Sequence, residues 1–221
     1  MPKSRRSPEE VEAVKAEILS QATQLICEEG FRGFSMRKLG ARLNVSAKTI
    51  YNYYHNIDEI YLSILTQGFE QLYRECVAAR QAHSTPGAQL KAMLKAYLDF
   101  GLQNPYLYNL MFTWVVPKYN DYLGTKMEPA ARIELETAQK SPALFAEAIM
   151  AYLAASADAV PITPEQAQVI VVQIWTQAHG YVAGINNTLL DYMIDDPISL
   201  KEIILESLFS QVGRITELGR M

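Results

Sequence analysis

The stretch FSMRKLGARLNVSAKTIYNYYHNIDEI, Phe34 to Ile60, contains two short helix-like segments separated by a few residues. In the first segment the inward stripe is Met36, Leu39, Gly40 and Leu43, which recur at helical spacing. Asn44 tolerates the left-handed backbone conformation that a tight turn requires. The stretch therefore predicts helices over about 35–43 and 46–54, joined by a tight turn.

Three tyrosines crowd the second segment and cannot all face one core. Ile50 and Tyr54, four residues apart, are expected to face the core with help from Val45, which leaves Tyr51 and Tyr53 pointing elsewhere. Two short helices on a longer first helix, the second rich in outward polar side chains, are typical of a helix-turn-helix whose second helix enters the DNA major groove. Spacing alone leaves open a polar, aromatic helical hairpin with no DNA partner.

The outward side chains suit contacts with DNA. Lys48 can bond guanine and Asn52 can bond adenine, so these two are the candidates for base readout. Tyr51 and Tyr53 can offer hydroxyls to backbone phosphates, and the small Ala47 allows a close approach to the base edges. The predicted DNA-binding residues are Ser35, Arg37, Lys38, Arg42, Ser46, Ala47, Lys48, Thr49, Tyr51, Asn52, Tyr53 and His55.

Charge is distributed unevenly along the chain. The net charge of −4 over 221 residues would ordinarily argue against a nucleic-acid partner. From Phe31 to Ile57, however, there are five basic residues and no acidic one. The sequence therefore predicts a local positive patch on an acidic protein.

The remaining sequence is also helical. Proline stands at several expected helix starts, as in Thr163-Pro164, where its missing N–H costs nothing, and no segment alternates as a strand does. The predicted fold is all-α, with residues 117–129 as a mobile loop, a DNA-binding domain over 1–60, and a larger helical domain over 61–221. The expected helices are 8–29, 35–43, 46–54, 57–82, 87–103, 105–116, 129–138, 142–157, 164–190 and 198–218.

The segment from about Glu12 to Leu62 resembles the tetracycline-repressor (TetR) family of bacterial regulators. The resemblance includes the Gly30-Phe31 break and the sequence TIYNYYHNIDEI, which matches the family's Leu/Ile-Tyr-x-Tyr-Phe followed by an acidic helix start. The family commonly has a lysine where this chain has Ile57. A phosphate contact there would fall to backbone N–H groups, or to His55 if it is protonated.

A second resemblance lies near the other end of the chain. Trp175, His179 and Gly180 match the Trp-x-x-x-His-Gly motif of a subset of the family. The resemblance implies that residues from about 61 onward bind a ligand, and that the helices near 164–190 and 198–218 form a homodimer. Two recognition helices about one DNA turn apart would then read a near-palindromic double-stranded operator.

Aromatic residues and methionine are dense between residues 97 and 114. Such side chains build apolar ligand pockets, although each one taken singly is more often a core residue. Because Arg and Lys do not cluster in the middle helices, we expect a neutral, apolar or aromatic small-molecule effector. The candidate pocket residues are Tyr97, Phe100, Tyr108, Met111, Phe112, Trp114, Trp175 and His179.

Other function classes find little support. The histidines at 55, 83 and 179 are widely spread, the two cysteines form no CxxC motif, and no catalytic, metal or cofactor site is legible. No apolar run is long enough to cross a membrane, so a cytoplasmic location is expected. The sequence thus predicts a ligand-released repressor rather than an enzyme, with an activator or adaptor that binds no small molecule as the alternative.

Overall fold

The computed structural model describes residues 7–155 and 161–218, with side chains described as far as residue 213. Within these ranges the chain forms nine α-helices and four short 3₁₀ helices and no strand, which confirms the all-α prediction. The α-helices are α1 (Pro8–Glu29), α2 (Met36–Arg42), α3 (Ala47–Ile50), α4 (Ile57–Gln81), α5 (Pro86–Gln103), α6 (Pro105–Phe112), α7 (Glu128–Ala154), α8 (Pro164–Asn186) and α9 (Lys201–Leu218).

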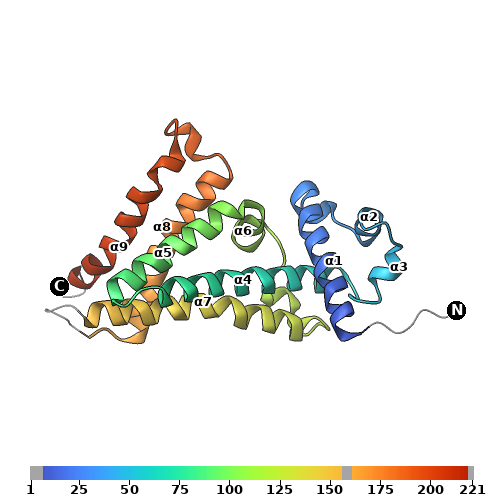
Figure 1. Cartoon of the computed structure of the whole chain (residues 1–221), viewed down its shortest axis with the longest axis horizontal. Helices are drawn as coiled ribbons and strands as arrows, with labels where there is room; N and C mark the ends of the chain where they lie inside the picture. Colours follow the sequence, from blue (N-terminus) through green and yellow to red (C-terminus); the bar gives the residue numbers. More distant parts are fainter. Residues whose placement is uncertain (1–6, 156–160, 219–221) are drawn as a thin grey trace. The chain divides into compact units, whose positions relative to one another are not determined.

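The chain divides into two compact units. The first consists of Met1–Gln67 and Val115–Leu135, and the second of Gly68–Trp114 and Glu136–Met221. Figure 1 shows α1, α2 and α3 grouped in the first unit, and α5 beside α8 and α9 in the second. The helices α4 and α7 each contribute residues to both units.

The segment after α6 belongs to the first unit. Within this unit the Tyr61 hydroxyl donates to the Pro117 carbonyl at 3.1 Å, and the Tyr122 hydroxyl donates to the Asp58 carboxylate at 3.2 Å. Tyr122 is buried and lies in a 3₁₀ helix, Tyr119–Tyr122. The mobile loop expected at 117–129 is therefore replaced by a segment packed on the start of α4.

A correction concerns α7, which we expected as two helices over 129–138 and 142–157. The structure has one helix with Pro142 inside it. Ser141-Pro142 resembles a capped helix start, but the buried positions 137, 141, 144 and 148 continue at helical spacing across the proline. Burial of this stripe overrides the local signal, at the cost of one backbone hydrogen bond.

Close helix packing shapes the second unit. A side-chain β-carbon at Gly101 of α5 would lie 2.5 Å from Val182 Cγ1 of α8, so glycine lets these two helices approach. The Tyr181 hydroxyl of α8 donates to the Pro197 carbonyl at 3.1 Å, which fixes the 3₁₀ helix Pro197–Leu200 that precedes α9. Among the described residues, no helix is long and apolar enough to cross a membrane.

Candidate DNA-binding surface and ligand cavity

The turn between α2 and α3 is held by local chemistry. Ser46 caps α3 by accepting a hydrogen bond from the Thr49 amide at 3.2 Å, and Asn44 adopts the left-handed conformation with φ of 54°. A β-carbon at Gly40 would lie 2.8 Å from the Val45 carbonyl oxygen. Only glycine permits this approach, so the two helices are tightly constrained relative to each other.

The second helix presents the expected faces. Ile50 and Tyr54 are buried, and burial raises the pKa of Tyr54 to about 12. Lys48, Tyr51 and Asn52 are exposed. The regular α-helix is shorter than predicted, ending at Ile50, after which hydrogen-bonded turns continue to Tyr54.

The prediction that Val45 helps to form the core is wrong, because its side chain is 40% exposed. The backbone of Val45 makes the contact instead, since its amide donates to the Gly40 carbonyl at 2.9 Å. The interface between helix and turn is therefore made by main-chain atoms.

Two basic residues that were predicted to contact DNA instead form ion pairs with acidic residues of α1. Arg42 donates to both carboxylate oxygens of Glu28, at 2.6 and 2.8 Å, and this hydrogen bonding lowers the pKa of Glu28. Lys38 bonds the Glu29 carboxylate and the Gly33 carbonyl. The acid-free segment therefore folds against acids from outside it, which local charge patterning cannot reveal.

The other predicted residues occupy varied positions. Ser35 caps α2 by accepting from the Lys38 amide at 3.2 Å, Arg37 is exposed, and Ala47, Thr49 and Tyr53 are half-buried. His55 is exposed, and its Nδ1 lies 2.9 Å from the Glu59 carboxylate. Among the described residues, Arg37 and Lys48 form no ion pair.

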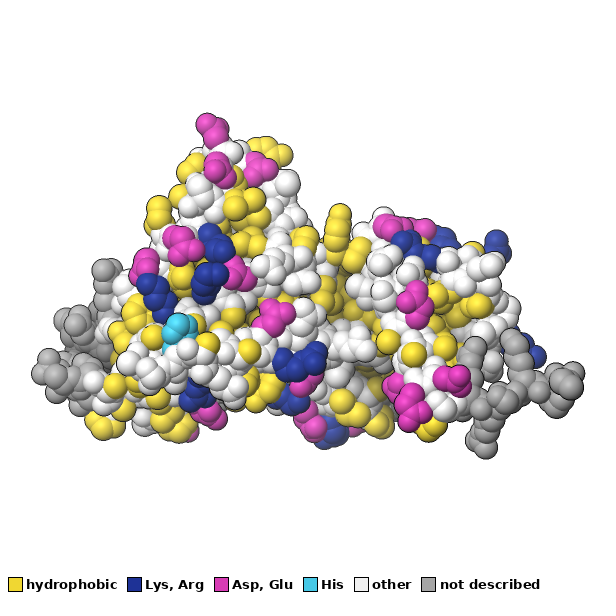
Figure 2. Space-filling model, in the orientation of Figure 1, with side chains coloured by type: hydrophobic (Ala, Val, Ile, Leu, Met, Phe, Trp, Pro, Cys, Tyr) yellow, Lys and Arg dark blue, Asp and Glu magenta, His cyan; other side chains and the backbone are white. Residues whose placement is uncertain are grey.

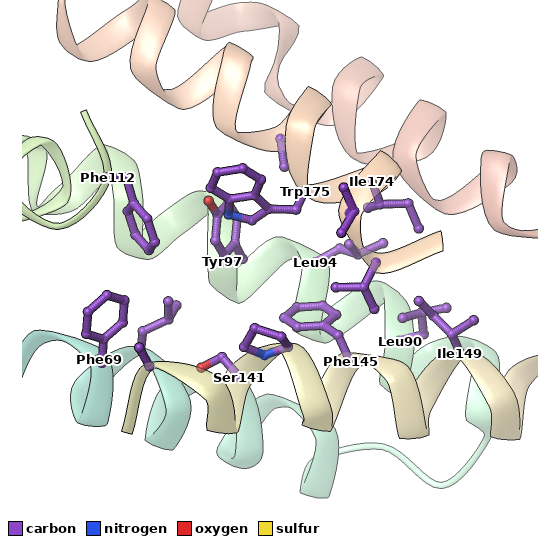
Figure 3. A pocket seen from close by; sticks show the side chains of 16 residues that line it. Phe69, Leu90, Leu94, Tyr97, Phe112, Ser141, Phe145, Ile149, Ile174 and Trp175 are labelled. Carbon is purple, nitrogen blue, oxygen red and sulfur yellow. The ribbon is translucent and has the colours of Figure 1, made fainter. Parts of the chain in front are cut away.

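The second unit contains a cavity of about 360 Å³. It lies between α4, α5, α6, α7 and α8, and Figure 3 shows its side chains pointing inward from these helices. Tyr97, Phe112 and Trp175 line it, as expected, and none of its described lining residues is acidic or basic. Figure 2 shows, by contrast, Lys and Arg mixed with Asp and Glu on the outer face in view.

A network of hydrogen-bonded side chains begins at Tyr97, which lines the cavity, and continues through Tyr108 to His179. The Tyr97 and Tyr108 hydroxyls lie 2.7 Å apart, and the Tyr108 hydroxyl is 2.9 Å from His179 Nδ1. The His179 ring stacks on Trp175 with centroids 4.8 Å apart, and burial lowers the pKa of His179. Burial therefore favours the neutral form of His179, which bonds Tyr108 in this network.

Five predicted pocket residues are absent from the cavity lining, namely Phe100, Tyr108, Met111, Trp114 and His179. Phe100, Tyr108 and Met111 are core residues, which is the alternative that the sequence left open. Sequence reasoning missed the wall that α7 supplies, because the helix was expected to break there. That wall includes Ala138, Ser141, Pro142 and Phe145.

These features define a class of protein in which a helix-turn-helix unit accompanies a helical unit with an apolar cavity. Residues 18–64 match the family model "Bacterial regulatory proteins, tetR family", and residues 90–205 match "Tetracyclin repressor-like, C-terminal domain". The second match alone covers more than half of the chain. The chain belongs to the TetR family.

Two curated relatives match part of the chain. The HTH-type transcriptional activator FasR of Mycolicibacterium smegmatis is 24% identical over 131 residues, which cover 59% of this chain and 57% of that protein. The uncharacterized HTH-type transcriptional regulator YobS of Bacillus subtilis is 25% identical over 110 residues, covering 50% and 57%. The chain thus spans little more than half the length of each.

Solved structures share the fold over most of the chain. The regulatory protein SCO4313 superimposes with a TM-score of 0.70 at 20% identity, covering 92% of this chain and 98% of that one. FadR from Bacillus subtilis, solved with stearoyl-CoA, superimposes with a TM-score of 0.66 at 14% identity, covering 88% of this chain and 97% of that one. AibR, solved with isovaleryl coenzyme A and operator DNA, gives 0.60 at 17% identity, covering 89% and 96%.

Proposed function

We propose that the protein is a homodimeric transcription regulator that reads a near-palindromic operator through α3 and responds to a small molecule in the cavity. The observation that carries the DNA-binding role is the pair of faces around α3. Ile50 and Tyr54 anchor it in the core, while Lys48, Tyr51 and Asn52 remain exposed. Membership of the TetR family supports this reading.

The exposed side chains have distinct proposed roles. Lys48 and Asn52 read base edges in the major groove, and Tyr51 positions the helix by bonding a phosphate. Arg37 adds a phosphate contact, since it is exposed and has no ion-pair partner among the described residues. Arg42 instead orients α2 through Glu28, so its effect on DNA binding is indirect.

The cavity suits a neutral, largely apolar effector. Its volume is near the lower end of the roughly 300–1,000 Å³ usual for ligand sites, and its described lining carries no charge. A second candidate is an acyl-CoA whose acyl part enters the cavity, and the structures of FadR and AibR with acyl-CoA molecules favour it.

Two helices can couple the cavity to DNA binding. Phe69 of α4 and Ser141 of α7 line the cavity, and the same helices continue into the first unit as Ile57–Gln67 and Glu128–Leu135. A ligand that favours one arrangement of α4 and α7 would change operator affinity through a reciprocal coupling free energy of about 1–3 kcal/mol.

The proposed dimer forms through α8 and α9. Large apolar side chains are exposed to solvent on both helices. They are Val169 and Val172 of α8, Ile198 just before α9, and Ile203 in the first turn of α9. Exposed apolar residues on neighbouring helices suit an isologous interface between two copies. Such a dimer would carry two α3 helices to successive turns of DNA.

The sign of regulation has two candidates. We propose repression relieved by the effector, because a ligand that opposes DNA binding needs no further partner. Activation is the second candidate, favoured by the name of the relative FasR. Transcription of a reporter behind the operator, with and without the protein, distinguishes the two.

Selection from a pool of random duplex DNA tests the DNA-binding role. The proposal predicts enrichment of a near-palindrome whose half-sites are centred about one helical turn apart. Recovery of unrelated sequences after repeated rounds would refute it. For the effector, thermal shift with isovaleryl-CoA and stearoyl-CoA beside neutral aromatic probes separates the two ligand classes, and no shift with any of them would refute the ligand-binding role.

A further inference from the structure

A serine on α7 is buried at the cavity wall without a hydrogen bond. Ser141 is only 6% exposed, and its Oγ has no hydrogen-bond partner among the described residues. The same residue lines the cavity. An unpaired buried hydroxyl is unfavourable and rare in native proteins, so a missing partner is the natural explanation.

The next residue removes a backbone hydrogen-bond donor. Pro142 has no amide N–H, so it cannot donate to the carbonyl of Ala138, which is its usual helical acceptor. Ala138 and Pro142 also line the cavity. The cavity wall from α7 thus includes Ser141, whose hydroxyl is unpaired, and Ala138 one turn earlier, whose carbonyl lacks its usual helical donor.

The rest of the cavity offers little polar chemistry. Figure 3 shows Ser141 on the α7 wall, facing Tyr97 and Trp175 on the other side of the cavity. The Tyr97 hydroxyl is already bonded to the Tyr108 hydroxyl. The remaining lining is mainly aliphatic and aromatic carbon from residues such as Leu94, Phe145 and Ile174.

We propose that Ser141 and the Ala138 carbonyl form a polar subsite that recognises a single neutral hydroxyl on an otherwise apolar ligand. Such a hydroxyl accepts from Ser141 Oγ and donates to the Ala138 carbonyl, as an alcohol or phenol can. A thioester carbonyl could accept but not donate, so it satisfies only half of the subsite. The inference rests on the proposed ligand-binding role of the cavity.

Two probes of equal size test the subsite, namely 2-naphthol and 2-methylnaphthalene, which differ by a hydroxyl in place of a methyl group. Calorimetric titration of each into wild type and Ser141→Ala gives four dissociation constants. We expect Ser141→Ala to raise the dissociation constant of 2-naphthol about fivefold to tenfold, because one hydrogen bond is lost. The dissociation constant of 2-methylnaphthalene should change by less than about twofold. Ser63→Ala, which removes a hydroxyl bonded to the Glu59 carbonyl in the first unit, should change neither.

A second variant probes the carbonyl. Pro142→Ala restores an N–H donor to Ala138 and also removes ring carbons from the cavity lining, so it should weaken the binding of 2-naphthol more than that of 2-methylnaphthalene. Ser141→Ala removes only an unpaired hydroxyl, so it should fold as the wild type does, which circular dichroism checks.

The outcomes separate the subsite from the cavity. If wild type binds both probes and Ser141→Ala changes both equally, or neither, the polar subsite is refuted and ligand binding by the cavity stands. If wild type binds neither probe, the cavity is not a site for such ligands, and the proposed subsite is refuted together with the ligand-binding role. A selective loss of 2-naphthol supports the subsite.

Discussion

Removing the Tyr108 hydroxyl should destabilise the second unit more than a single lost hydrogen bond would. This hydroxyl bonds both the Tyr97 hydroxyl at 2.7 Å and His179 Nδ1 at 2.9 Å, and Tyr108 is fully buried. Tyr108→Phe removes both bonds: Tyr97 keeps its hydrogen bond with Trp175, whereas the half-buried His179 Nδ1 loses its Tyr108 partner. A lost hydrogen bond costs about 1 kcal/mol, and a buried group left unpaired costs about 1–3 kcal/mol. We expect a loss of about 2–4 kcal/mol in the free energy of unfolding.

Tyr97→Phe is the comparison, because it removes the Tyr97 bonds to Tyr108 and Trp175 and leaves the bond between Tyr108 and His179 intact. Trp175 is 38% exposed, so its indole N–H can bond water instead. Tyr97→Phe should cost about 1 kcal/mol, and the double variant should cost less than the sum of the two. Urea unfolding followed by tryptophan fluorescence measures this, since both tryptophans of the chain, Trp114 and Trp175, lie in the second unit. Equal losses for Tyr108→Phe and Tyr97→Phe would refute the bridging role.

Three further predictions concern other parts of the molecule. Gly40→Ala should destabilise the first unit by about 1–3 kcal/mol, because the added β-carbon clashes with the Val45 carbonyl. At Gly180 an added β-carbon meets nothing within 4 Å, so Gly180→Ala should be neutral or stabilising. Scanning calorimetry of the two variants measures the change in stability of each. Because burial lowers the pKa of His179, stability of the second unit should fall as the pH drops below about 6.5, and His179→Gln should flatten that fall in pH-dependent melting curves. Ile203→Glu should shift the protein from dimer to monomer in sedimentation velocity, and an unchanged dimer would contradict the proposed interface.

The helix-turn-helix was predictable because its signals are local. Capping by Ser46 and the left-handed Asn44 depend on neighbours within a few residues, and the spacing of Ile50 and Tyr54 already indicates which face of the helix is buried. The pairing of Arg42 with Glu28 was not predictable, since it joins residues fourteen apart on different helices. An outward position on a helix predicts exposure but not the absence of a partner.

The cavity was only partly predictable for a related reason. Aromatic density pointed to Tyr97, Phe112 and Trp175, but density does not distinguish a cavity wall from the core, where Phe100 and Tyr108 lie. The α7 wall was missed because Ser141-Pro142 has the local pattern of a helix start. Only the buried stripe that continues past the proline reveals a single helix, and that stripe is defined by tertiary packing.

Binding to DNA from the region upstream of the protein's own gene tests the central claim most directly. Fluorescence anisotropy over a salt series would compare wild type with Lys48→Ala, with Tyr51→Phe, and with Lys140→Ala as a control that removes the same charge from the second unit. The account predicts tight sequence-specific binding by wild type and the control, weaker or less specific binding by Lys48→Ala, and a salt slope that reports several phosphate contacts. Equal weakening by Lys48→Ala and Lys140→Ala, or binding indifferent to sequence on this DNA and on selected duplexes, would contradict the role of α3.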